Sequence, residues 1–219
     1  MADLWLVRHG QAGDLLGDYD RLSERGWEQA RRAGERWGEL APVQQVVSGA
    51  MRRHRETAEG FAEAFGEVPP MVIDPDWNEF DHQAVIKAWI RAHGPPPEPG
   101  RRAFFTLFGH AMGRWASGDH DGDYPESWEA FEQRVDAALS RAVEALPSGS
   151  TGLVFTSGGV VSAVVRSLLG LDARKSFELN TVLMNTGFTR LRVSGGRRTL
   201  VSLNEVSHLR DRPDLITHA

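Results

Sequence analysis

Arg8 and His9 stand directly after the first apolar run of the chain, residues 4–7, and Gly10 follows them. A short run of branched and aromatic residues that ends at a glycine predicts a buried strand of an α/β sheet. Ligands bind off the carboxyl ends of the strands in such sheets. An arginine there offers a fixed positive fork, and a histidine offers a nitrogen nucleophile or an acid. Phosphoryl chemistry needs this pair.

Polar residues that can contact a phosphoryl group also follow two further apolar runs. Arg53 follows residues 43–48, and Ser157 follows a later run and precedes Gly158 and Gly159. Strands that are each followed by a returning helix run parallel, so we expect these residues to meet at one edge of the sheet. Two arginines can hold the oxygens of a phosphoryl group, and a glycine pair lets a helix present backbone N–H groups to it. The sequence therefore predicts a phosphate-sized pocket.

The elements that must position these residues alternate along the chain. Residues 24–41 repeat apolar positions at helical spacing, the strand over residues 43–48 follows, and a second helix runs to about residue 65. This order predicts a three-layer α/β/α sandwich around a mostly parallel sheet. Further helices are expected over residues 128–146 and 161–169. A hairpin is expected around Ser194-Gly195-Gly196.

Residues from about 84 to 120 interrupt the alternation. They contain two short apolar helices separated by a proline-rich spacer. We interpret this segment as a helical cap insert that packs on the sheet within a single domain spanning residues 1–219. Its aromatic and basic side chains could face a ligand or solvent.

The composition excludes several classes of function. The 219 residues include no cysteine, which rules out disulfides, thiolate metal sites and a cysteine nucleophile. The net charge of −5 argues against general binding to nucleic acid or to an anionic membrane. The first residues lack a basic leader, and no apolar run approaches the ~20 residues of a membrane span. We therefore expect a cytoplasmic protein.

Several blocks in order resemble the histidine phosphatase superfamily, the phosphoglycerate-mutase-like enzymes. They are Arg8-His9-Gly10-Gln11 with residues 20–30, residues 48–58 with the sequence SGAMRRHRETA, Glu126-Ser127-Trp128 with Arg134-Val135, and Gly158-Gly159. The similarity spans nearly the whole chain. It implies a phosphohistidine intermediate.

The resemblance also implies roles for individual residues. His9 corresponds to the histidine that attacks phosphorus, and Arg8 corresponds to a phosphate clamp. The spacing to the Thr-Ala pair of the second block favours Arg53 as the second clamp, with Arg52 as the alternative. Glu79 matches best the carboxylic acid that protonates the leaving group, and Asp81 is the second choice.

The main departure from the family pattern lies before the glycine pair. The family has a second histidine before the glycine pair, and Ser157 stands there in this chain. Serine can donate a neutral hydrogen bond but supplies no positive charge, so reduced activity is expected. His110 or His54 could substitute for the missing imidazole. Ser157 and Gly158 are expected to bind phosphate together with Arg8 and Arg53.

The resulting prediction is a metal-independent phosphatase, without a cofactor, that acts on a small phosphorylated metabolite through a phosphohistidine at His9. One alternative is a non-catalytic binder of phosphate or a phosphorylated ligand. Others are a mutase of the phosphoglycerate type and a protein phosphohistidine phosphatase. The substrate stays open, and so does the oligomeric state, a homodimer included.

Overall fold

The computed structural model describes residues 1–13, 20–38, 40–96 and 100–218. Within them one mixed sheet has the strand order β3-β2-β4-β1-β5-β6. The first four strands in that order are parallel, and β5 and β6 run antiparallel to their neighbours. The bounds are β1 Ala2–Arg8, β2 Gln45–Ser48, β3 Val72–Ile73, β4 Thr151–Thr156, β5 Phe188–Ser194 and β6 Arg197–Glu205. The predicted mostly parallel sheet is confirmed.

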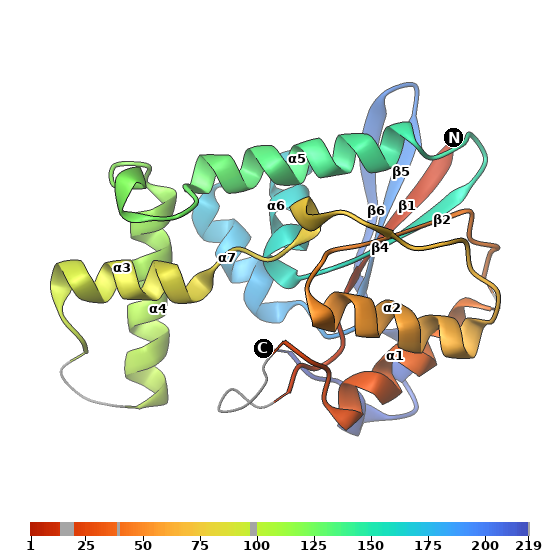
Figure 1. Ribbon diagram of the computed structural model, residues 1–219, viewed down its shortest axis with the longest axis horizontal. Coiled ribbons are helices and arrows are strands. Elements are labelled where there is room, and N and C mark those ends of the chain that lie inside the picture. Colours follow the sequence, from red (N-terminus) through yellow and green to blue (C-terminus); the bar gives the residue numbers. More distant parts are fainter. Residues whose placement is uncertain (14–19, 39, 97–99, 219) are drawn as a thin grey trace.

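Helices cover both faces of this sheet (Figure 1). Helices α1 Glu24–Trp37 and α2 Arg52–Phe65 lie on one face, and α5 Trp128–Glu144, α6 Gly158–Leu169 and α7 Ala173–Val182 lie on the other. Helices α3 His82–His93 and α4 Arg101–Ala116 extend beyond the end of the sheet. Short 3₁₀ turns occur at Pro75–Trp77, Asp121–Asp123, Ser207–Leu209 and Pro213–Leu215.

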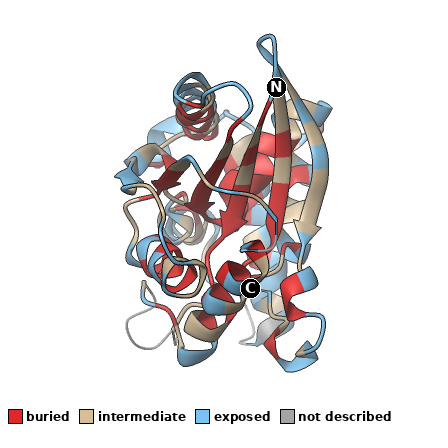
Figure 2. Ribbon diagram, turned by 90° about the vertical axis from the view of Figure 1, so that its right-hand side faces the viewer, coloured by how far each residue is buried: buried red, intermediate tan, exposed pale blue. Residues whose placement is uncertain are grey.

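Side chains that alternate along the central strands build two cores. On β1, Leu4 and Leu6 belong to the core under α5 and α6, whereas Val7 belongs to the core under α1 and α2. This alternation follows from the period of two along a strand. Figure 2 shows the central strands buried and the β6 edge largely intermediate or exposed. The carboxyl ends of β1, β2 and β4 are therefore held on a rigid, buried frame.

The segment predicted as a cap forms the pair α3 and α4. Met112 and Trp115 of α4 and Val85 of α3 are buried and join the core that includes Phe131 of α5. The pair thus packs on the rest of the chain through apolar side chains. Residues 97–99 of the predicted insert lie outside the described residues. That residues 84–120 cap the site stays a prediction.

Two details differ from the sequence-based expectation. Helix α1 ends at Trp37 rather than near residue 41, because Gly38 caps it and the Trp37 indole donates a hydrogen bond to the carbonyl of Ala41 at 2.9 Å. Helix α7 was not predicted. Ser176 is its only fully buried residue, and a helix that buries so little needs no strong apolar periodicity in its sequence. The hairpin is confirmed, with Gly195 and Gly196 both at positive φ.

Within the described residues, no helix combines the length and the apolar character that a membrane crossing requires.

Candidate active site

His9 follows β1 and is buried, with its backbone N–H held by the Thr156 carbonyl of β4 at 2.8 Å. Its Nδ1 lies 2.7 Å from the carbonyl oxygen of Gly10. A carbonyl only accepts hydrogen bonds, so Nδ1 carries the proton and Nε2 keeps a free lone pair. Burial, followed by the charges of Arg53 and Arg8 and by His54, lowers the pKa of His9 well below its ordinary value. The ring is therefore a neutral imidazole that can attack an electrophile through Nε2.

Two buried arginines adjoin this imidazole. Arg8, the last residue of β1, donates from Nη1 to the carbonyl of Leu183. Arg53, in the first turn of α2, donates from Nη1 to Asp20 Oδ1 at 2.7 Å and from Nη2 to Ser157 Oγ at 3.4 Å. Arg52 is exposed and pairs with Glu56 at 2.6 Å. The structure thus brings Arg53, and not Arg52, to the strand ends.

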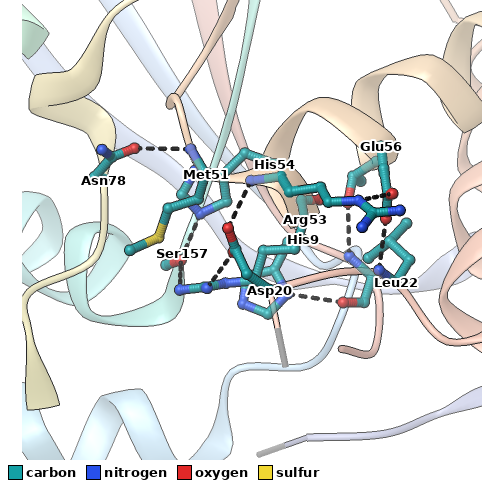
Figure 3. Close-up of polar contacts among 12 residues, drawn as sticks. His9, Asp20, Leu22, Met51, Arg53, His54, Glu56, Asn78 and Ser157 are labelled. Carbon is teal, nitrogen blue, oxygen red and sulfur yellow. Dashed lines mark hydrogen bonds and ion pairs between the residues drawn. The ribbon is translucent and has the colours of Figure 1, made fainter. Parts of the chain in front are cut away.

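Ser157 lies between β4 and α6 and is completely buried. Although it occupies the N-cap position of α6, its side chain makes no capping hydrogen bond within the described residues. Its Oγ lies instead 2.6 Å from Nε2 of His54 (Figure 3). The ring centroids of His54 and His9 are 5.8 Å apart. Of the two histidines considered as substitutes, the structure therefore brings His54 to the site.

The other histidine lies elsewhere. His110 is exposed on α4, where its ring centroid is 5.5 Å from that of Trp89. No group of three or more metal-ligating side chains occurs in the described parts of the chain.

Glu79 reaches the N-terminus of α6. Its Oε2 accepts the backbone N–H of Gly159 at 2.9 Å, and its Oε1 accepts the N–H of Phe80 at 3.2 Å. A Cβ atom on residue 159 would lie 2.2 Å from Glu79 Oε1, so only glycine permits this approach. Asp81 is exposed and caps α3 by accepting the N–H of Ala84 at 2.9 Å. Of the two candidate acids, Glu79 is the one that contacts the site.

Gly158 opens the same helix terminus to polar side chains. A Cβ atom at this position would lie 2.3 Å from Asn180 Oδ1 and 3.3 Å from Arg8 Nε. The glycine therefore allows Arg8 to pass close to the first turn of α6. Helix N-termini favour bound anions, which supports the expected role of Gly158 in phosphate binding. That role stays a prediction.

Sequence reasoning missed Asp20 and Asn78. Asp20 Oδ2 accepts the N–H of Arg52 at 3.0 Å, and Asn78 Oδ1 accepts the N–H of Met51 at 3.1 Å (Figure 3). These side chains accept the backbone N–H groups at the start of α2. The N-cap residue of this helix, Met51, has no side-chain oxygen that could do so. A helix that begins with methionine and a basic cluster needs acceptors from elsewhere, and that signal was available in the sequence.

A further set of missed residues fixes the backbone around the histidine. Thr57 Oγ1 accepts the N–H of Gly10 at 3.0 Å and donates to the carbonyl of Arg53 at 2.6 Å. Asn185 Nδ2 donates to the carbonyl of His9 at 2.9 Å. These bonds tie α2 and the segment before β5 to the end of β1. The backbone on both sides of the His9 side chain is therefore fixed by the protein itself.

Together these residues define a class of protein. An α/β sheet presents a neutral buried histidine at the carboxyl end of its central strand, flanked by two arginines, a helix N-terminus and a carboxylate. This arrangement suits transfer of an anionic group to nitrogen. Residues 4–206 match the family model described as the histidine phosphatase superfamily, branch 1. The chain belongs to this family.

Curated relatives carry the name of a mutase. The chain is 32% identical over 181 residues to the probable phosphoglycerate mutase GpmB of Citrobacter koseri, covering 79% of this chain and 77% of that protein. It is 30% identical over 181 residues, with the same coverage, to the protein of that name from Salmonella arizonae.

Solved structures show the same fold at lower identity. YhfR of Bacillus stearothermophilus superposes with a TM-score of 0.69 at 20% identity, covering 95% of this chain and 100% of that chain. A mutant phosphoserine phosphatase of Entamoeba histolytica, solved with phosphoserine, gives 0.68 at 19% identity with the same coverage. A mycobacterial glucosyl-3-phosphoglycerate phosphatase, solved with inorganic phosphate, gives 0.65 at 23%, covering 94% of this chain and 98% of that chain.

Proposed function

We propose that this protein is a metal-independent phosphatase that hydrolyses a small phosphorylated metabolite through a phosphohistidine at His9. The observation that carries the proposal is the state of the His9 ring. Its Nδ1 is bonded to the Gly10 carbonyl at 2.7 Å, and burial and two arginines lower its pKa. A neutral nucleophile beside fixed positive charge is what attack on a phosphoryl dianion requires.

The proposed reaction has two steps. His9 Nε2 attacks phosphorus while the bond from phosphorus to the leaving oxygen breaks, and Glu79 in its acid form gives that oxygen a proton. Water then attacks the phosphohistidine, the P–N bond breaks, and the Glu79 carboxylate takes a proton from the water. Arg8 and Arg53 hold the phosphoryl oxygens throughout, and the N-terminus of α6 adds backbone donors.

Phosphohistidine formation tests this proposal. The purified protein is mixed with phosphorylated metabolites, phosphoserine and 3-phosphoglycerate among them, in the presence of a chelator, and phosphate release and acid-labile phosphoprotein are measured. We expect both signals in the parent and neither in His9→Ala, whose fold is checked by circular dichroism. His110→Ala, which changes an exposed histidine, is the matched control.

Release of phosphate without acid-labile phosphoprotein, undiminished in His9→Ala, would place the chemistry at another residue. Phosphate binding without any turnover would favour a binding protein instead.

A mutase is the second candidate, because the curated relatives at 30–32% identity carry that name. A mutase returns the phosphoryl group from histidine to another hydroxyl and excludes water. The two functions separate in one measurement on a phosphoglycerate. Phosphorus NMR shows an isomeric phosphoglycerate for a mutase and inorganic phosphate for a phosphatase.

A further inference from the structure

The hydroxyl group of Ser157 is held by α2 rather than by its own helix. At an N-cap position a serine oxygen usually accepts an N–H of the following turn. Here Oγ lies 2.6 Å from His54 Nε2 and 3.4 Å from Arg53 Nη2 (Figure 3). Two side chains from the first turn of α2 therefore converge on a single buried oxygen at the end of β4.

The surroundings of His54 decide which nitrogen carries its proton. The ring is completely buried, and its Nδ1 has no hydrogen-bond partner among the described residues. Nδ1 is packed against Gly49, where a Cβ atom would come within 2.3 Å of it. A proton on Nδ1 would be a buried donor without an acceptor, which is rare and costly. A proton on Nε2 reaches Ser157 Oγ, so the structure favours the Nε2–H tautomer.

The bonding capacity of Ser157 then points to a ligand. A hydroxyl oxygen has one hydrogen to donate and two lone pairs with which to accept. Arg53 can only donate, and His54 in the Nε2–H tautomer also donates. Both lone pairs are thus engaged, and the hydroxyl hydrogen must go to an acceptor elsewhere. An oxygen of a phosphoryl group held by Arg53 and Arg8 is such an acceptor.

We infer that Ser157 donates its hydroxyl hydrogen to the phosphoryl group and that His54 is the positioning residue that enforces this direction. The inference rests on the proposed function in that a phosphoryl group is the ligand. His54 receives no proton and bears no charge in this arrangement. Burial, followed by the charge of Arg53, lowers its pKa well below the ordinary value, which agrees with a neutral ring. Donation into Oγ polarises the O–H bond toward the anion.

A double-mutant cycle tests the coupling. Ser157→Ala removes the donor, and we expect kcat to fall about 10²-fold. His54→Leu replaces the imidazole with an apolar side chain of moderate size and leaves the Ser157 hydroxyl free to rotate. We expect kcat to fall up to about tenfold, with a smaller change in KM. His54→Gln can place an amide N–H where Nε2 stood and should recover most of the rate.

The diagnostic result is non-additivity. In Ser157→Ala there is no hydroxyl for His54 to orient, so adding His54→Leu should cost no further activity. A merely structural role for His54 would lower activity equally in both backgrounds and would show as a lower melting temperature. Additive losses, or a His54→Leu enzyme as fast as the parent, would overturn the inference.

The tautomer is measured without any turnover. Long-range ¹H–¹⁵N spectra of ¹⁵N-histidine-labelled protein distinguish the two tautomers, and His54→Gln assigns the signal. We expect the proton on Nε2, and inorganic phosphate should bind several-fold more weakly to His54→Leu than to the parent. A proton on Nδ1, or equal phosphate affinity, would overturn the inference even if no substrate is found. Lack of turnover in the parent would count against the proposed function alone.

Discussion

Asp20 lies over Arg53 with its Oδ1 2.7 Å from Nη1, and its Oδ2 accepts the backbone N–H of Arg52 at 3.0 Å. The Asp20 carboxylate thus accepts hydrogen bonds from both an arginine side chain and the first backbone N–H of α2. These are groups that a phosphoryl group would also use. Asp20 therefore partly neutralises the basic start of α2, residues 52–55.

Removing that charge should strengthen anion binding. We expect Asp20→Asn to bind inorganic phosphate up to about tenfold more tightly, because the carboxylate no longer competes for Arg53 or repels the anion. Titration calorimetry measures the change. Asp211→Asn, which breaks an exposed pair with Arg32, is the matched control. Weaker binding in Asp20→Asn would mean that the carboxylate orients Arg53 for the ligand.

The neighbouring residues Arg52 and Arg53 should differ sharply in their contributions to phosphate binding. Arg53 is buried at the strand ends, whereas Arg52 is exposed and pairs with Glu56. A charge-assisted hydrogen bond contributes about 1.5–3 kcal/mol, so Arg53→Ala should weaken phosphate binding by about ten- to a hundredfold. Arg52→Ala should change it little. A larger loss of phosphate affinity in Arg52→Ala than in Arg53→Ala would show that Arg52 is the arginine that binds phosphate.

The role of Glu79 depends on the leaving group. An alkoxide needs a proton, whereas p-nitrophenolate leaves without one, so Glu79→Gln should slow an alkyl phosphate by about 10²- to 10⁴-fold and p-nitrophenyl phosphate much less. Glutamine can still accept the Gly159 N–H, so the contact with α6 survives. Asp81→Asn is the control. Equal losses of rate on both substrates would show that Glu79 is not the general acid.

Buried histidines should make the fold sensitive to acid. Burial, followed by the charge of Arg32, lowers the pKa of His208 to about 4, and its Nε2 lies 2.8 Å from Thr186 Oγ1. The unfolded chain binds a proton near pH 6.5, whereas the folded chain does so only near pH 4. The contribution of neutral His208 to the free energy of unfolding is therefore fully present above about pH 6.5. It is lost as the pH falls toward 4, and the loss from this residue is roughly 3 kcal/mol at most.

Urea unfolding at pH 7.5, 6.0 and 5.0 measures this loss. His9 and His54 act in the same direction, because their pKa values are also lowered. His208→Gln should reduce the pH dependence, and His110→Ala, at an exposed position, should leave it unchanged. A free energy of unfolding that is flat over this range would contradict the expectation.

The sequence alone was sufficient where a local pattern carried the information. A short apolar run placed Arg8 and His9 at a strand end. The resemblance of residues 48–58 to the family's second block favoured Arg53, the arginine that the structure brings to Ser157. Periodicity reports the burial of neighbouring residues, so elements with a strong apolar face were predictable and α7 was not.

Only the tertiary structure decided which distant side chains meet. His54 and Ser157 are 103 residues apart, and Asn185 and His9 are 176 apart. These pairs form because β4 lies between β1 and β2 in the sheet, and because the segment before β5 returns to the end of β1. Strand order, and hence the partner of a buried polar group, depends on packing of the whole chain. The sequence placed an imidazole in α2 and a hydroxyl after β4, and the fold alone made them a pair.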